Sequence, residues 1–238
     1  MTAQPLEDVH TTRWSLIHEL DAGNADSRSQ FNALCLRYWA PVHQYILGHG
    51  HHEAHARQLT QRFFTLLQAE GLSRATGYTR FRDFLASELG AFLSACGEQP
   101  DEAFLPPLSP VAGAPAPAIS APPPGDAVPV AGTSLERNLA LEVVAQSMAR
   151  LRKEAADAGH RGMFERLQRY LSVEPHGDEL QREAEALEAT QLFVSLAIRR
   201  LRQRFRSIVD DELTQLVTDP TQLADERNAM FAALERVG

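Results

Sequence analysis

Residues Asp178–Arg206 read DELQREAEALEATQLFVSLAIRRLRQRFR, and they predict a short helix, a turn and a long helix. Asp178 and Gln181 have the three-residue spacing of a capping box, which favours the start of a helix. Thr190 is a residue type that caps helix N-termini, and the apolar residues after it recur every three or four positions, as on one face of a long helix. This order, with a basic distal half on the second helix, is the outline of a helix–turn–helix.

Helical periodicity also fills the rest of the chain outside one proline-rich stretch. In the first half, apolar side chains such as Phe81, Phe84, Leu85 and Leu89 recur at helical spacing. No segment shows the alternation of apolar and polar residues that is typical of a half-buried strand. We therefore expect an all-α fold and no parallel-sheet nucleotide-binding domain.

The proline-rich stretch divides the chain. Ten of the 14 prolines lie between Pro100 and Val130, among Ala, Gly and Ser residues and without Lys or Arg. Such a composition disfavours packed elements and is typical of a linker. We predict a disordered Pro/Ala-rich linker over 100–133 that joins two helical domains, 1–99 and 134–238, the second of which holds the helix–turn–helix.

Composition indicates a protein of the reducing cytoplasm. The 2 cysteines, Cys35 and Cys96, lie in apolar helical patterns without a CxxC partner, which excludes a fold built on disulfides. No stretch is long and apolar enough to span a membrane, and residues 1–10 lack the basic and apolar regions of a secretion signal. The net charge of −8 argues against a simple basic coat for nucleic acid. We expect a cytoplasmic protein without a membrane partner.

The sequence predicts neither an enzyme nor a metalloprotein. The densest set of metal-ligating residue types is His49, His51, His52, Glu53 and His55. It reads HHEAH rather than HExxH, and no further ligand completes a shell, so polar residues around a turn and a helix start are the simpler interpretation. Nucleophile-elbow and phosphate-loop motifs are absent from the sequence. We therefore expect no catalytic residues, no metal site and no cofactor.

The run Arg199–Arg206 holds the densest positive charge of the chain. Leu201 and Phe205 interrupt the run and can anchor the helix, so that the guanidinium groups project outward, toward phosphates. The alternative is that these arginines pair within the protein, with the acidic run Asp210–Glu212 or with the acidic helix before them. Spacing alone leaves both interpretations open.

Short motifs in both halves of the chain agree in order and spacing with those of one known family. In the first half they are TRWSL at 12–16, LCLRYWAP at 34–41, LTQRFF at 59–64 and RFRDFL at 80–85, and in the second half they are AIRRLRQRFR at 197–206 and VTDP at 217–220. Together they resemble the extracytoplasmic-function (ECF) sigma factors of bacterial RNA polymerase. The resemblance implies a transcription factor whose first domain docks on core polymerase and melts the minus-ten promoter element. Its second domain would read the minus-35 element, with the linker threaded between them.

The resemblance also implies two sets of functional residues. For promoter DNA we expect Thr190, Gln191 and Ser195 near bases, and Arg199, Arg200, Arg202 and Arg204 on phosphates. For core polymerase we expect the helix face formed by His55, Arg57, Gln58, Thr60, Gln61 and Arg62.

The sequence departs from the family's pattern at several positions, and two of these bear on the core-binding and DNA-binding regions. Ahead of Leu59, where the family carries an acidic patch that pairs with the polymerase, the sequence has His55-Ala-Arg57-Gln58. Where the turn of the helix–turn–helix normally has glycine, the sequence has Glu188, a residue that disfavours positive φ.

These departures leave two interpretations. In the first, the protein is a working ECF-type sigma factor, and phosphate on Thr60 supplies the missing negative charge, about −1.5 to −2 at neutral pH. A Ser/Thr kinase or an anti-sigma factor would then be a partner. In the second, it is a degenerate sigma-like protein that acts as an interaction or regulatory module without initiating transcription. The basic end of the second helix favours the first interpretation.

Overall fold

The computed structural model describes residues 14–15, 25–75, 77–97 and 134–236. These residues are helical almost throughout, and their one β contact is an isolated antiparallel bridge between Arg80 and Val217. The prediction of an all-α fold is confirmed. The predicted linker over 100–133 lies outside the described residues.

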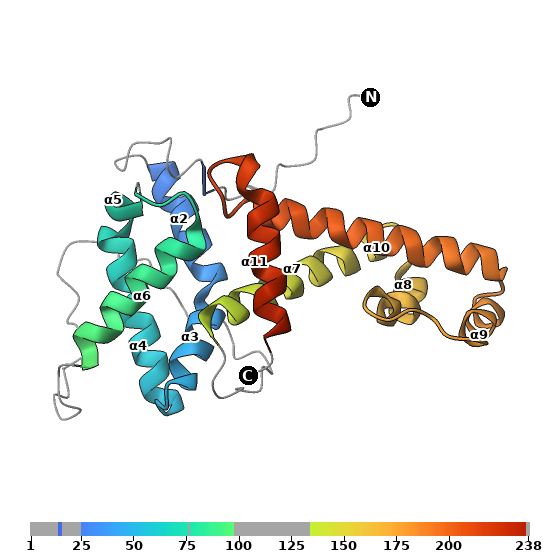
Figure 1. The fold of residues 1–238 in the computed structure, drawn as a ribbon, viewed down its shortest axis with the longest axis horizontal. Helices are drawn as coiled ribbons and strands as arrows, with labels where there is room; N and C mark the ends of the chain where they lie inside the picture. Colours follow the sequence, from blue (N-terminus) through green and yellow to red (C-terminus); the bar gives the residue numbers. More distant parts are fainter. Residues whose placement is uncertain (1–13, 16–24, 76, 98–133, 237–238) are drawn as a thin grey trace.

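The helices before the linker form a bundle at one end of the molecule (Figure 1). They are α2 (Ala25–Arg37), α3 (Trp39–Gly48), α4 (Glu53–Leu66), α5 (Leu72–Ala75) and α6 (Phe81–Gly97), with a π-helical turn, η1 (Leu67–Gly71), between α4 and α5. Gly50 has φ +89°, a conformation that glycine adopts without a steric penalty, and it lets the chain reverse from α3 into α4. His52 then caps α4, because its Nδ1 accepts a hydrogen bond from the Ala54 N–H at 3.2 Å.

The helices after the linker build an arm that leaves the bundle and returns to it (Figure 1). They are α7 (Leu135–Asp157), α8 (Arg161–Leu167), the 3-10 helix η2 (Gln168–Leu171), α9 (Glu179–Ala186), α10 (Gln191–Thr214), the 3-10 helix η3 (Pro220–Gln222) and α11 (Leu223–Glu235). Figure 1 shows α8 and α9 at the far end of the arm, and α11 beside the bundle. Within the described part of the chain, no helix has both the length and the apolar composition that crossing a membrane requires.

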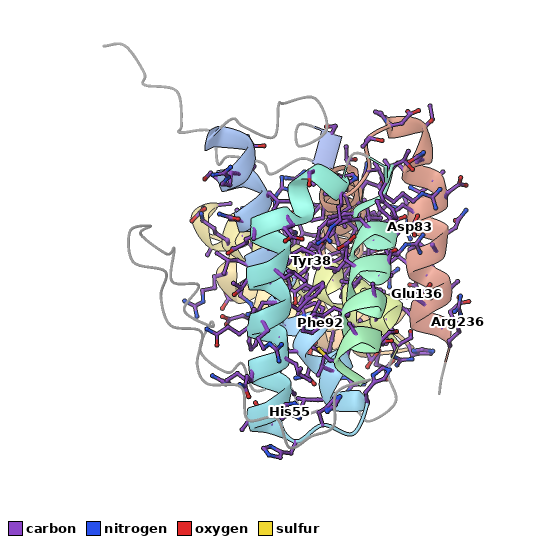
Figure 2. The ribbon with its side chains drawn as sticks, turned by 90° about the vertical axis from the view of Figure 1, so that its left-hand side faces the viewer. Tyr38, His55, Asp83, Phe92, Glu136 and Arg236 are labelled. Carbon is purple, nitrogen blue, oxygen red and sulfur yellow. The ribbon has the colours of Figure 1, made fainter. Side chains whose placement is uncertain are left out.

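The two halves of the chain share one hydrophobic core. It contains Tyr38 and Phe81 from the first half, and Leu139 of α7, Leu213 of α10 and Met230 of α11 from the second. Tyr38 lies between the helices in the interior of the bundle (Figure 2). The core therefore continues across the position of the linker, and the division into domains 1–99 and 134–238 stays a prediction.

Backbone hydrogen bonds reinforce the contact between the halves. The Trp14 N–H donates to Gln215 O at 2.7 Å, the Phe81 N–H to Leu216 O at 2.9 Å, and the Thr218 N–H to Thr79 O at 3.0 Å. All three tie the segment just after α10 to the first half of the chain. These bonds fix the end of α10 on the bundle, and the shared core adds the start of α7 and α11.

A second, smaller core holds the far end of the arm together. It consists of Leu167, Tyr170, Ala184, Val194 and Ile198, which come from α8, η2, α9 and α10. The pair α9 and α10, predicted to be a helix–turn–helix, is thus anchored by residues of its own, apart from the shared core.

Glu226 of α11 is a buried carboxylate at the contact between the halves. Its residue exposure is 4%, and its Oε2 lies 3.3 Å from Arg82 Nη2 and 3.9 Å from Arg80 Nε. Burial raises the pKa of Glu226 above its ordinary value, although both arginines lower it, and the nearby Asp83 and Glu136 raise it further. Both of these acidic residues lie on the side of the bundle that faces α11 (Figure 2).

We expect the free energy of unfolding of Glu226→Gln to increase, relative to that of the wild type, as the pH rises. Because the pKa of Glu226 is higher in the folded chain than in the unfolded chain, the folded wild type binds more protons in the interval between the two values. The free energy of unfolding of the wild type therefore falls as the pH rises from about 4 through this interval, and the glutamine does not contribute to that fall. Urea denaturation at a series of pH values measures both slopes. Asp225→Asn, a change at the exposed neighbouring carboxylate, is the control, and equal slopes for Glu226→Gln and the wild type would contradict the prediction.

Candidate nucleic-acid interface

The turn between α9 and α10 contains a residue in the left-handed backbone conformation. Glu188 has φ +50°, and in the described ranges it is the one residue other than glycine with positive φ. Beside it, the Ala189 N–H donates to Ala184 O at 2.9 Å and closes the end of α9. Glu188 thus adopts the left-handed conformation at the position where the resemblance aligns the family's turn glycine. A side chain in this conformation costs about 1–2 kcal/mol.

We expect Glu188→Gly to raise the melting temperature by a few degrees. Glycine relieves the strain of positive φ, and about 1 kcal/mol corresponds to about 2–4 °C in a protein of this size. The control is Glu185→Gly, because Glu185 is equally exposed but lies inside α9, where glycine costs about 1 kcal/mol. Calorimetry that gives both variants the same loss of stability would contradict the assignment of strain to Glu188.

The first two turns of α10 present one face to solvent. Thr190 caps the helix, with its hydroxyl oxygen accepting a hydrogen bond from the Phe193 N–H at 3.2 Å. Gln191 and Ser195 are exposed, and Val194, on the opposite side of the helix, is buried in the smaller core. The residues predicted to lie near bases therefore share the uncovered start of α10.

The arginines predicted to bind phosphates fall into two groups. Arg199 and Arg200 are exposed, and among the described residues neither forms an ion pair or side-chain hydrogen bond. Arg206, two turns further along, has the same properties. These three guanidinium groups are available to a partner.

Arg202 and Arg204 are engaged within the arm. The Arg202 Nε donates to Tyr170 O at 2.7 Å and its Nη2 to Val173 O at 2.8 Å, and its Nη1 pairs with Glu174. Arg204 donates to both carboxylate oxygens of Glu154 at 2.7 Å. This hydrogen bonding lowers the pKa of Glu154.

In this conformation Arg202 and Arg204 have partners within the arm, and their assignment to phosphates stays a prediction. Arg202 satisfies carbonyl groups at the end of η2, and Arg204 ties α10 to α7. Arg202 and Arg204 thus pair within the protein, with Glu174 and Glu154 as their ion-pair partners. The acidic run Asp210–Glu212 forms its own ion pairs with other arginines, although Asp211 also interacts electrostatically with Arg204. Its members pair with Arg227, Arg150 and Arg37 in turn.

The predicted polymerase-binding face lies on α4. Gln58 and Gln61 are exposed, and His55, Arg57 and Arg62 are partly exposed. Figure 2 shows His55 near the start of α4, at the edge of the bundle. These residues are brought together on one surface, and none of them adds negative charge.

Thr60 does not belong to this surface. It is 0% exposed, and its hydroxyl donates to Ala56 O at 2.7 Å, one turn earlier in α4. A kinase cannot reach this hydroxyl while α4 is packed. The prediction that Thr60 contacts polymerase and accepts phosphate is therefore wrong for the folded protein.

The histidines around the start of α4 have structural contacts. His52 caps α4, the His49 Nδ1 lies 2.8 Å from Tyr45 O, and the rings of His51 and His55 meet edge to face at 5.0 Å. Across the described ranges, no group of three or more His, Cys, Asp or Glu residues is arranged to hold a metal ion.

Exposed apolar side chains at the start of α10 were not anticipated from the sequence. Leu192, Phe193 and Leu196 are 70%, 51% and 42% exposed. The helical register could have predicted their exposure, because they fall outside the stripe of Val194 and Ile198 that faces the smaller core.

No protein-family model, no curated protein and no solved structure matches this chain.

Proposed function

We propose that this chain is an ECF-type sigma factor that directs core RNA polymerase to promoter DNA in the cytoplasm. In this proposal it acts by binding and not as an enzyme: α9 and α10 bind the promoter, and the exposed face of α4 binds core polymerase. The observation that carries the proposal is the pair of helices α9 and α10, which are joined at Glu188 by a turn with positive φ despite an unfavourable residue. A strained conformation is kept where the surrounding structure imposes it, and such positions cluster at functional sites.

Charge on the outer face of α10 supports the same conclusion. Arg199 and Arg200 follow the exposed helix start and have no acidic neighbour bound to them among the described residues. Glu183, a buried acid of the preceding helix α9, is already paired with Arg166 and Arg169. Arginines beyond the start of a recognition helix are suited to phosphates, which position the helix while its first turns meet the bases.

The salt dependence of DNA binding tests this assignment. A duplex is first selected from a random library with the full chain, and its affinity is measured over a series of salt concentrations. Each phosphate contact contributes about 0.9 to the slope of log K against log [salt], so Arg199→Ala/Arg200→Ala should reduce the slope by about 2. Arg152→Ala, at an exposed arginine of α7, removes the same kind of charge and should leave the slope unchanged. An unchanged slope in the double variant would remove both arginines from the interface.

A charge reversal tests docking on polymerase. In the family that the chain resembles, the region ahead of Leu59 is acidic, and here Arg57 opposes that charge. We expect Arg57→Glu to increase the fraction of the chain retained by immobilised core polymerase, because it restores one acidic residue to the exposed face. Arg152→Glu makes the same reversal on α7 and should leave retention unchanged. Equal retention of all three proteins would argue against docking through this face.

The shared core favours a second candidate, a regulatory interaction module that does not initiate transcription. Leu139, Leu213 and Met230 join the second half to the first, whereas an ECF sigma factor would use its two domains on separate promoter elements. This candidate predicts capture of a protein other than core polymerase and no transcript from any template.

A further inference from the structure

Three apolar side chains stand on the surface that α10 would present to DNA. Leu192 and Leu196 are one turn apart, and Phe193 flanks them. Their exposed fractions of 70%, 42% and 51% are large for side chains of this size. Exposed apolar groups that lie together need an explanation, because water disfavours them.

Their surroundings are polar and positively charged. Gln191 and Ser195 lie in the same two turns, and Arg199 and Arg200 follow in the next turn. The start of α10 thus carries apolar and hydrogen-bonding side chains, and guanidinium groups that are unpaired among the described residues follow it. This arrangement complements the major groove of DNA, which has methyl groups on its floor and phosphates along its edges.

The patch is small and convex. Stable protein interfaces bury about 800 Å² on each partner and involve about 20–30 residues a side. Three side chains on the outer face of one helix supply only part of that area. The patch therefore fits a few base edges better than a flat protein surface.

We propose that Leu192, Phe193 and Leu196 contact the 5-methyl groups of thymines in the major groove, so that the recognised site contains thymine at the positions facing these residues. This proposal rests on the proposed DNA-binding function and specifies which bases the site reads. The thymine methyl is the one apolar group on the floor of the major groove, and apolar side chains are its natural contacts.

Replacement of thymine by deoxyuridine tests the proposal, because it removes the methyl group and leaves base pairing intact. In the duplex selected with the full chain, each thymine is replaced in turn. Burying one methyl group contributes about fourfold in affinity, so wild-type protein should bind about fourfold more weakly when deoxyuridine replaces a contacted thymine. At the thymines that face the two leucines, the Leu192→Ala/Leu196→Ala variant should bind both duplexes equally, whereas a thymine that faces Phe193 should keep its effect. Leu141→Ala changes a leucine of α7 that is 47% exposed and should respond to deoxyuridine as the wild type does.

The other outcomes are distinct. Specific, salt-dependent binding that is indifferent to deoxyuridine at every thymine would overturn the methyl contacts and leave the proposed function intact. Failure of the selection to enrich any sequence, or failure to bind DNA at all, would overturn both. Self-association of the wild type that is lost in Leu192→Ala/Leu196→Ala, with DNA binding unchanged, would assign the patch to a second copy of the chain and overturn the proposal. Thermal denaturation of each variant verifies that these exposed positions leave the fold intact.

Discussion

Thr60→Glu should lower the free energy of unfolding by more than about 3 kcal/mol, and it should not activate the protein. Thr60 is 0% exposed and lies on the buried face of α4 with Leu59 and Phe63. A glutamate at this position adds a longer side chain and an unpaired charge to a packed interior, and burial of such a charge is costly. Urea denaturation followed by circular dichroism measures the loss.

Two control variants separate charge burial from other effects of the substitution. Thr60→Val keeps the shape and removes only the hydroxyl that donates to Ala56 O, so its cost should be about 1 kcal/mol. Thr65→Glu places the same charge on an exposed position of α4 and should change stability by less than about 0.5 kcal/mol. A Thr60→Glu protein that is as stable as the wild type and gains affinity for core polymerase would reinstate phosphorylation of Thr60 as the switch.

Trp14→Ala should destabilise the protein by about 3–5 kcal/mol. The Trp14 side chain is 0% exposed and packs on Phe81 and Phe84, with ring centroids 5.3 Å away in each case. Its indole N–H donates to Tyr78 O at 3.1 Å. Its backbone N–H reaches Gln215 O, so the tryptophan stands where the two halves of the chain meet.

Trp14→Phe is the matched variant, because it retains an aromatic ring and removes the indole N–H. It should cost about 1–3 kcal/mol, since it leaves the Tyr78 carbonyl without this donor and leaves part of the site of Trp14 empty. Both variants are compared by urea denaturation. A loss of less than about 1 kcal/mol in Trp14→Ala would show that Trp14 does not hold the two halves together.

Local sequence patterns predicted the parts of the fold that depend on neighbours in the chain. The helical spacing of apolar residues, the cap at Thr190 and the turn at Glu188 each depend on a few consecutive residues, and the structure has them. The shared core could not be predicted in this way. It brings together residues far apart in the sequence, such as Tyr38 and Leu213, and the proline-rich stretch favoured two separate domains.

The exposure of the candidate site residues was predicted correctly where it depends on local helical register and incorrectly where it depends on contacts between distant residues. The exposure of Gln191, Ser195 and Arg199 follows from the helical register. The engagement of Arg202 and Arg204 depends on Glu174 and Glu154, whose distance from α10 is set by the folding of the arm. The burial of Thr60 likewise depends on which face of α4 meets the bundle. Because threonine is polar, its residue type gave no indication that it would be buried.

Transcription reconstituted from purified bacterial core polymerase tests the central claim most directly. The template carries the selected duplex upstream of a reporter sequence, and the reaction is run with core polymerase alone, with wild-type chain and with Arg199→Ala/Arg200→Ala. We expect a transcript with a fixed start site that is absent with core polymerase alone, appears with the wild-type chain and is strongly reduced with the double variant. The same products with and without the wild-type chain, under conditions where it binds the template, would contradict the claim that this protein directs polymerase to promoters.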